Sequence, residues 1–500
     1  MKLEEFRKYF NQLKPGEIFY ARPIFNDDFM LRMSELLGKD NYKKFEYLIE
    51  KDNSIELKYF LENNYSVKNG HSNLKRYHEM VSMDFDILLE PDIETEHPYY
   101  LGFYSDSIPL YIVIELLCVY FDNESSNYWL TGTIAKDSST KSEEKHIKIN
   151  GELIFMASPA STHEFTLCIS KETTDIKDKA KLCKIINQLK KEYEDKLYDD
   201  PKPLTENDIP LSVKEIHCYN IGQGNCIRLN GLDDENIFFD VGLTKYKYEK
   251  KQKEIINNIE KIKLIHPDII ILSHWDEDHI MGLLLWDDSI YTKTWIVPDI
   301  RSLCFDSEGQ ERKSIKVSLY ALRIYIKLLK CKSSNVYIIS EKLEKTCIYN
   351  KNKSHQNPGI EIWTGVRIES SYKNHKITSN NNFGLIIVVH GSCKNTILCG
   401  DCDYKIIADS INQAHHYDNV IVSHHGAMMN PFPFTPLPQN KGNAKAIVSY
   451  GIFNNHKHPN NSTINTISKN GYQIIPTVGL FKYVINILDE NVENLRIYGL

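Results

Sequence analysis

Residues 273–282 read SHWDEDHIMG and directly follow the apolar run DIIIL at residues 268–272. Two histidines and three acids therefore fall within six residues, at the end of a segment apolar enough to be a buried strand. A chain that leaves such a strand can turn His274 and Asp276 toward one ion. Asp278 and His279, at the start of a following helix, can then reach a second ion. Because imidazoles and carboxylates are ligands of first-row metals, the motif predicts a metal centre. The alternative is a solvated acidic loop.

Four shorter motifs also place polar residues next to apolar runs. They are YNIGQGNC at residues 219–226, FDVG at 239–242, CGD at 399–401 and SHHGA at 423–427. Each has a plainer interpretation. The Asp401 segment can be an ordinary turn, and His424 and His425 can be surface or core histidines. The first motif lacks the Lys-Ser/Thr pair of a phosphate loop, so its glycines indicate a tight turn.

In this order, the motifs resemble those of the metallo-β-lactamase superfamily, whose signature is His-x-His-x-Asp-His at the end of a strand. The resemblance covers residues 211–487 and none of residues 1–200. It implies an α/β domain, a metallo-β-lactamase αββα sandwich. Asp276 stands where the signature has its second histidine, and in this the chain is similar to the ComEC-like hydrolase domain of competence proteins. An oxygen ligand makes the site harder, so manganese joins zinc as a candidate metal.

The resemblance also implies a role for each motif. Two divalent metal ions, zinc or manganese, would be bound, and Asp401 would bridge them. The implied metal ligands are His274, Asp276, Asp278, His279, Asp401 and one or both of His424 and His425. Asp240 would brace these ligands from behind. The sequence does not decide between His424 and His425.

For catalysis, Asp278 would orient a metal-activated hydroxide. His458, in NNHKHP at residues 454–459, would contact a phosphate or protonate a leaving group; an ordinary loop histidine is the alternative. Asn225 and Ala427 depart from the family pattern. Many members have a further ligand histidine before the Gly-Asp motif, and none of His355, His375 and His390 has a convincing context. Whether one of the two implied metal positions is filled in this chain is therefore left open.

The chain is expected to form an α+β N-terminal domain (residues 1–200), a linker (201–210) and the hydrolase domain (211–500). Residues 198–210 read YDDPKPLTENDIP, a linker composition. In the first domain, Leu3, Phe6, Phe10 and Leu13 recur at helical spacing. Apolar runs predict strands at 110–121, 128–135 and 147–156, and a helix is expected at 174–197. This domain contains no chemical motif.

In the second domain, short apolar runs alternate with helical patterns. Strands are expected at 216–229, 237–240, 268–272, 383–390, 395–398 and 419–423. Helices are expected at 254–264 and 317–331, and residues 464–474 should form a helix and a strand. In the helix at 254–264, Ile255, Ile259 and Ile262 should point inward.

Composition limits the remaining possibilities. The chain has 500 residues, 42% of them hydrophobic, and a net charge of −7, so it has no overall basic coat for nucleic acid. The longest apolar stretch, residues 111–121, contains Glu115 and is too short to span a membrane. With no apolar signal core at its start, the chain is expected to be cytoplasmic. Most of its 11 cysteines should be reduced, and Cys399 and Cys402 have no second pair to complete a zinc site.

Three functions are compatible with these patterns. The first is a phosphodiesterase or nuclease that uses a metal-activated hydroxide, with nucleic acid or a nucleotide as substrate. The second is a hydrolase of small esters, lactones or nucleotides. The third is a partner-regulated sensor or effector of a bacterial (antiviral) defence system, with residues 1–200 binding the protein partner. A basic run at residues 245–253 favours a polymer substrate, although such a run is more often a solvated helix face.

Overall fold

The computed structural model describes residues 3–25, 27–50, 56–57, 59–61, 79–89, 100–122, 130–135, 139–156, 160–171, 204, 212–232, 234–243, 253–305, 317–330, 335–350, 359–367, 370–372, 375–377, 379–391, 394–411, 416–430, 438, 443–451, 458–487 and 495–498. They belong to two compact units. The barrel unit comprises Met1–Leu197 and Ile300–Lys327, and the sandwich unit comprises Tyr198–Asp299 and Leu328–Leu500. The expected division differs in one segment, because residues 300–327 pack with the N-terminal residues.

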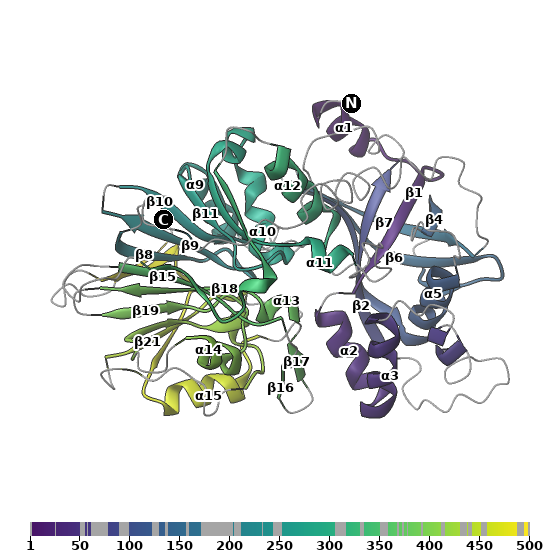
Figure 1. Ribbon diagram of the computed structural model, residues 1–500. Helices are drawn as coiled ribbons and strands as arrows, with labels where there is room; N and C mark the ends of the chain where they lie inside the picture. Colours follow the sequence, from purple (N-terminus) through teal and green to yellow (C-terminus); the bar gives the residue numbers. More distant parts are fainter. Residues whose placement is uncertain are drawn as a thin grey trace. The chain divides into compact units, whose positions relative to one another are not determined.

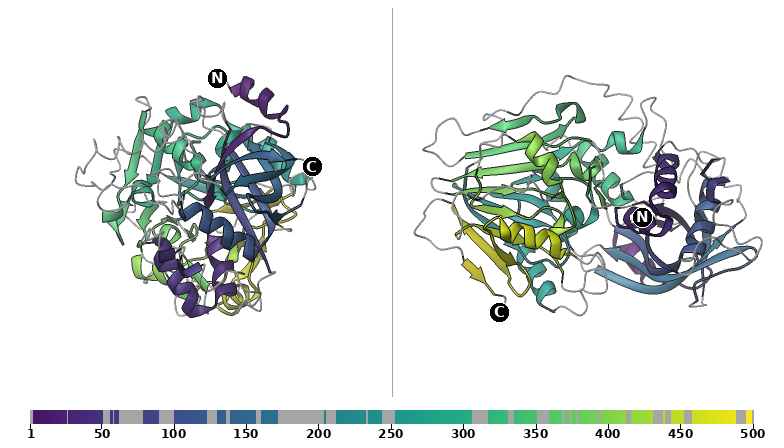
Figure 2. Two further views of the ribbon diagram at one scale, coloured as in Figure 1. Left: turned by 90° about the vertical axis from the view of Figure 1, so that its right-hand side faces the viewer. Right: turned by 90° about the horizontal axis from the view of Figure 1, so that it is seen from below.

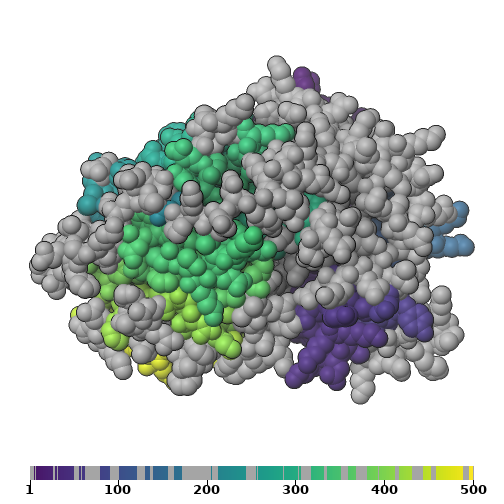
Figure 3. Space-filling view, in the orientation of Figure 1, coloured from purple at the N-terminus to yellow at the C-terminus, as the bar shows by residue number. Residues whose placement is uncertain are grey.

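The barrel unit is built on an antiparallel sheet that closes on itself. Its strands are β1 (Ile18–Ile24), β2 (Met80–Leu89), β3 (Tyr100–Pro109), β4 (Leu130–Ala135), β5 (Lys141–Ser142), β6 (His146–Met156) and β7 (Ala160–Ser170). The order is β3-β2-β1-β4-β7-β6-β5, and a further β3–β6 pairing completes a six-stranded ring. With the helices α1 (Leu3–Phe10), α2 (Asp27–Leu37), α3 (Lys39–Glu50) and α5 (Leu110–Asp122), this confirms the α+β prediction. Figure 3 shows α2 and α3 in purple at the surface.

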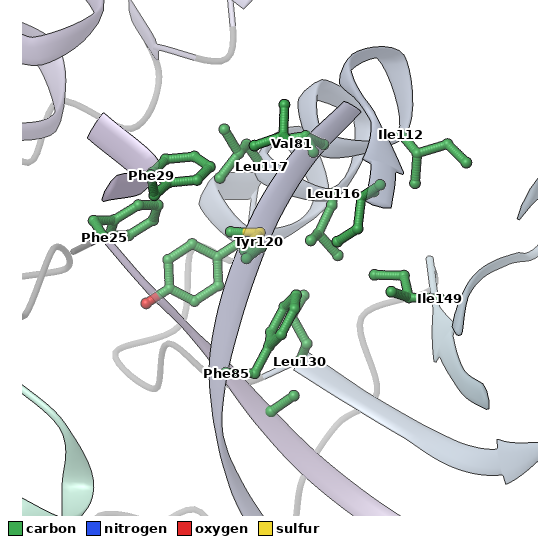
Figure 4. Packing of buried hydrophobic residues seen from close by; sticks show 14 of the residues in the cluster. Phe25, Phe29, Val81, Phe85, Ile112, Leu116, Leu117, Tyr120, Leu130 and Ile149 are labelled. Atoms are coloured by element: carbon green, nitrogen blue, oxygen red, sulfur yellow. The ribbon is translucent and has the colours of Figure 1, made fainter. Parts of the chain in front are cut away.

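Helix α5 corrects one prediction, because residues 110–121 were expected to be a strand. Figure 4 shows Leu116, Leu117 and Tyr120 of this helix among Phe85 of β2 and Leu130 of β4. A helix that is buried on most of its faces is apolar at nearly every position, so the period of the pattern cannot distinguish it from a buried strand. Its 13 residues without glycine or proline are the signal that favours a helix.

Residues 300–327 contain α11 (Arg301–Cys304) and the start of α12 (Leu319–Lys330). Both carboxylate oxygens of Asp86, on β2, lie 3.0 Å from the backbone N–H of Leu319 and accept from it. Arg22 on β1 forms a buried ion pair with Asp86 at 2.5 Å. A carboxylate at a helix N-terminus satisfies free N–H groups and interacts favourably with the helix dipole. The barrel thus supplies the cap of a helix from a distant part of the chain.

The first sheet of the sandwich unit brings four parallel strands together. Its order is β13 (Val336–Ile339), β12 (Thr294–Pro298), β11 (Ile269–Ile271), β10 (Asn236–Val241), β9 (Cys226–Gly231), β8 (Val213–Tyr219), β23 (Lys482–Asn486) and β24 (Leu495–Ile497). β10 to β13 pair in parallel. Their carboxyl ends therefore meet at one edge of the sheet.

The second sheet has a parallel half of the same kind. Its order is β14 (Cys347–Asn350), β15 (Gly359–Thr364), β18 (Leu385–His390), β19 (Asn395–Leu398), β20 (Asn419–Ile421), β21 (Lys445–Val448) and β22 (Gln473–Pro476). β19 to β22 pair in parallel. A separate hairpin is formed by β16 (Ser370–Tyr372) and β17 (His375–Ile377).

The two sheets stack face to face, with helices outside them (Figure 1). Ile271 of β11 and Ile387 of β18 belong to the core between the sheets. The neighbouring Ile386 points the other way, into a second core with Ile407 of α14 (Tyr404–Ser410). Successive side chains along a strand thus pack into different cores on the two faces of the sheet. Figure 2 shows α15 (Asn461–Lys469), in yellow, beside the second sheet. With α9 (Lys253–Lys263) also present, the predicted αββα sandwich is confirmed.

Most other predicted elements are also confirmed. The structure has α1, α12, β4, β6 and the strands expected in the sandwich unit, except that the stretch 216–229 is divided between β8 and β9. Ile255, Ile259 and Ile262 of α9 are buried. The helix expected at 174–197, the lysines at 245–251 and nearly all of the linker at 201–210 lie outside the described residues. In the part of the chain that the structure describes, no helix is both long and apolar enough to cross a membrane.

Candidate metal centre

The predicted site residues come together where parallel strands of both sheets end. β10 ends at Asp240-Val241, and β11 leads into the motif at residues 273–282, where α10 (Glu277–Ile280) begins. On the second sheet, β19 leads to Asp401, and β20 leads to a short 3₁₀ helix, Ser423–Gly426. The carboxyl ends of parallel strands are a common place for ligand sites in α/β folds, since the loops there converge.

Asp240 holds the motif loop from behind. Its Oδ1 accepts a hydrogen bond from the Ser273 backbone N–H at 2.7 Å, and its Oδ2 accepts one from Ser273 Oγ at 2.8 Å. Oδ2 also lies 2.8 Å from Nδ1 of His279. Asp240 is fully buried and has a left-handed backbone, with φ 58°. This is the geometry that the predicted bracing role requires.

Three imidazoles have their Nδ1 atoms next to oxygen atoms. His279 Nδ1 faces Asp240, His274 Nδ1 lies 2.9 Å from Ser273 Oγ, and His425 Nδ1 lies 2.9 Å from the carbonyl oxygen of Ser449. If each Nδ1 carries the proton and donates it to its oxygen, each Nε2 keeps its lone pair. That is the tautomer in which Nε2 can bind a metal ion.

The Nε2 atoms face two carboxylates. Asp401 Oδ1 lies 3.1 Å from His279 Nε2, and Asp401 Oδ2 lies 3.8 Å from His274 Nε2. Asp278 Oδ2 lies 3.2 Å from His425 Nε2. These residues form two donor groups compact enough to hold an ion: His274, His279 and Asp401, and Asp278, His279 and His425. His279 is common to both.

Three predicted residues lie at the margin of these groups. Asp276 Oδ2 is 3.4 Å from His274 Nε2, and His424 Nε2 is 3.6 Å from Asp401 Oδ2. The ring of His458 lies 5.5 Å from that of His424, centroid to centroid. His425 is therefore the member of the pair that joins a compact donor group, while His424 lies between Asp401 and His458. Both have left-handed backbones, which cost energy for a residue other than glycine and cluster at functional sites.

The donor set fits a divalent cation. His274 Nε2, His279 Nε2 and Asp401 Oδ1 are buried and have no hydrogen-bond partner, although an unpaired polar atom in the interior is costly. Burial favours the neutral forms of these histidines and carboxylates, but the attraction between their opposite charges outweighs the effect of burial. The carboxylates of Asp401, Asp240 and Asp278 raise the pKa of His279 well above its usual value, and His279 with the other imidazoles lowers the pKa of Asp401 well below its usual value. A bound metal ion would satisfy these atoms without protonating the histidines.

Two glycines let neighbouring turns approach the motif. A side chain at Gly242 would come within 1.9 Å of the carbonyl oxygen of Asp278, and one at Gly224 within 2.6 Å of it. The same carbonyl accepts a hydrogen bond from the Asn225 N–H at 3.1 Å. The turns at 219–226 and 239–242 therefore pack against the base of α10, which fixes the direction in which Asp278 leaves the backbone.

The sequence did not single out Ser273 or Ser449, although each holds an imidazole. The signal for Ser273 was its position, directly between a buried strand and the first histidine; Ser449 has no local signal. His390 lies 3.3 Å from Glu361, and both residues are buried. His355 lies outside the described residues, as does the side chain of His375. Cys399 and Cys402 are buried free cysteines.

Residues 219–348 match the family model described as the Metallo-beta-lactamase superfamily. That segment is a metallo-β-lactamase domain. No curated protein matches the chain. Among solved structures, Zn²⁺-bound PqqB from Methylobacterium extorquens is similar at 8% identity and TM-score 0.30, over 52% of this chain and 97% of that one. Human tRNase Z, short form, is similar at 11% identity and TM-score 0.27, over 55% and 100%. A diphosphatase of the PhnP family is similar at 10% identity and TM-score 0.27, over 52% of this chain and 94% of that one.

Proposed function

We propose that the sandwich unit is a metal-dependent hydrolase that cleaves phosphodiester bonds, with nucleic acid as its substrate. The observation that carries the proposal is the set of buried imidazole and carboxylate atoms around Asp401 that face one another and have no hydrogen-bond partner. The two donor groups overlap at His279, whose one free nitrogen can bind a single ion; His274 with Asp401 on one side, and Asp278 with His425 on the other, would supply the remaining ligands for two divalent ions, zinc or manganese. Bound there, such ions would supply Lewis-acid activation of water and of the bond to be cleaved.

The protein's own residues would orient the reactants. Asp278 is one-third exposed, whereas His279 and Asp401 are almost completely buried, so Asp278 can meet a substrate or a water molecule from the open side. Its carboxylate lies beside Nε2 of His425 at 3.2 Å, which restricts its rotation. Asp278 is therefore proposed to orient the attacking water. His458, beside His424, is proposed to contact the phosphate or to protonate the leaving oxygen.

The choice of substrate rests on Asp276 and on the ComEC-like pattern. Asp276 adds a carboxylate beside His274 where the superfamily signature has a histidine, which makes the site richer in oxygen. Oxygen ligands suit the metals that assist phosphoryl chemistry. Hydrolysis of a small ester, a lactone or a nucleotide is the alternative, since one fold hosts many reactions. Regulation by a partner, as in a defence effector, is a further proposal for the barrel unit.

The proposal is tested by incubating the purified chain with single- and double-stranded DNA and RNA, with Mn²⁺ or Zn²⁺ added. Cleavage that depends on metal is expected, and the Asp278→Asn variant should lose it. Asp234→Asn is the matched control, because that side chain is 85% exposed on a distant turn. If Asp278→Asn retains full cleavage, Asp278 does not have this role. If the folded wild-type chain cleaves none of these polymers but hydrolyses a small ester or nucleotide, the substrate class is wrong.

A further inference from the structure

An asparagine turn, residues 379–384, lies beside the candidate metal centre. It begins with the short helix α13 (Ser379–Asn382) and leads into β18. Asn380 is buried, and its Nδ2 donates a hydrogen bond to Asp276 Oδ1 at 3.1 Å. Asp276 Oδ2 faces His274 Nε2 at 3.4 Å. One oxygen of this carboxylate is thus held by the amide, while the other is directed toward an imidazole of the donor group.

The asparagine turn is itself tied to both ligand-bearing loops. The Leu385 N–H, directly after the turn, donates to the carbonyl oxygen of Ser273 at 2.9 Å, just before His274. On the other side, Asn382 Oδ1 accepts from the N–H of Asp403 at 3.1 Å, two residues beyond Asp401. The turn therefore bridges the motif loop and the Gly-Asp loop. Asn380 projects from a rigid position against Asp276.

This support matters because Asp276 is 30% exposed, whereas His274 is 1% exposed. A partly exposed carboxylate has free rotamers, and fixing it in one orientation costs conformational entropy when a ligand binds. A hydrogen bond to one oxygen reduces that freedom before an ion arrives. Partners that orient metal ligands in this way raise metal affinity.

We infer that Asn380 is a positioning residue that holds Asp276 as a single-oxygen ligand of the metal position next to His274 and Asp401. The inference rests on the proposed function, since it presumes that the donor groups bind metal. It distinguishes the two positions: the one beside Asp276 depends on the asparagine turn, while at the other Asp278 faces His425, whose Nδ1 lies against the carbonyl oxygen of Ser449. The two positions should therefore respond differently to a change at Asn380.

The experiment is a titration of the metal-free chain with Mn²⁺, and separately with Co²⁺, whose visible spectrum reports its ligands. Asn380→Ala should weaken binding at one position about 10-fold and leave the other within about twofold, and should change the Co²⁺ spectrum of the weakened position. Asn380→Ser retains a hydrogen-bond donor and should recover part of the affinity. Thermal unfolding of each metal-free variant checks that the fold is kept.

The control is Asn419→Ala, which removes another buried asparagine whose Nδ2 donates to a side chain, that of Thr396, at 3.2 Å. It should leave metal affinity unchanged. In a chain that already carries Asp276→Ala, Asn380→Ala should have no further effect on metal binding. An equal loss in that background, or unchanged binding in Asn380→Ala itself, overturns the inference and leaves the proposed function standing. If the folded wild-type chain binds neither metal, the proposed function and the inference are both overturned.

Discussion

Two buried carboxylates, one in each unit, have opposite surroundings. Asp86 in the barrel unit is 1% exposed, accepts from Arg22 Nε at 3.2 Å and Nη2 at 2.5 Å, and caps α12 at Leu319. Asp401 in the sandwich unit is 3% exposed, and its Oδ1 has no hydrogen-bond donor. It faces Nε2 of His279 and of His274, and neither nitrogen has a hydrogen-bond partner.

The difference distinguishes a carboxylate that stabilises the fold from one that we propose binds an ion. The desolvation cost of Asp86 is offset by a cation and by backbone N–H groups, so the folded chain is complete there without a ligand. The desolvation cost of Asp401 is offset only by the imidazoles around it, which would have to take up protons to do so. Removing each carboxylate should therefore have opposite consequences for stability and for activity.

The largest effect is expected for Asp401→Ala. The variant loses the carboxylate that faces both His274 and His279, so hydrolysis should fall by about 10³-fold or more. Because Asp401 makes no hydrogen bond through Oδ1, the metal-free variant should remain folded. Kinetics with saturating metal, together with circular dichroism, measure the two effects. Retained activity would remove Asp401 from the centre.

Asp86→Ala should have the reverse effect. It leaves the buried guanidinium of Arg22 without its carboxylate and uncaps α12, so the free energy of unfolding should fall by about 3–5 kcal/mol. Urea unfolding measures this loss. In the double variant Arg22→Met, Asp86→Leu, neither position leaves an unpaired buried charge, and much of the lost stability should return. A single variant as stable as the wild type would contradict the structural role.

Metal should stabilise the wild-type chain and not Asp401→Ala. An ion at about 100 times its dissociation constant adds about 3 kcal/mol to the free energy of unfolding, because it binds the folded state alone. Thermal melts with and without a chelator measure the shift. Asp86→Ala, although less stable, should still gain from metal. An equal gain in Asp401→Ala would indicate binding elsewhere.

A smaller effect is expected at His217, a buried histidine whose ring nitrogens both have partners. Nε2 lies 3.0 Å from Glu215, and Nδ1 lies 3.1 Å from Lys482 Nζ. Burial lowers the pKa of His217 from 6.5 to about 4. Between these two pH values the unfolded chain binds more protons than the folded chain. The contribution of His217 to the free energy of unfolding is therefore complete above pH 6.5 and is lost as the pH falls to 4. A pKa that is lower by about 2.5 units in the folded chain corresponds to a loss of about 3 kcal/mol by pH 4.

The measurement is urea unfolding at pH 7 and pH 4.5 for the wild type and for His217→Gln. The comparison between the two proteins removes the contribution of the other acids, since these titrate in both. His217→Gln should lose less stability on acidification than the wild type does. Equal losses would mean that burial does not keep His217 neutral.

The sequence predicted the features that depend on residues close together in the chain. The motif at residues 273–282 is contiguous, and its position after a buried strand was enough to predict a metal centre there; the sandwich was predicted from the family that the motifs, in their order, resemble. Helix α5 was assigned wrongly because a helix buried on most faces has no polar side to reveal its period. The capping of α12 by Asp86 could not be predicted, since the contact joins residues more than 200 positions apart.

The residues that position the site's side chains could not be predicted for the same reason. Ser449 lies 24 positions from the histidine that it holds, and Asn380 lies 104 positions from Asp276. Such pairs leave no local pattern, because they arise from the stacking of two sheets. That His425, and not His424, faces Asp278 also required coordinates, since adjacent residues in an irregular turn can point in any direction.

The central claim is that the buried donors around Asp401 bind metal. It is tested most directly by treating the purified chain with a chelator and titrating it with Mn²⁺ or Zn²⁺ in a calorimeter, beside Asp401→Ala. Two ions should bind per wild-type chain, with release of protons from the histidines, and Asp401→Ala should bind at least one of them far more weakly. A folded wild-type chain that binds no metal, or a variant that binds as the wild type does, would contradict the claim.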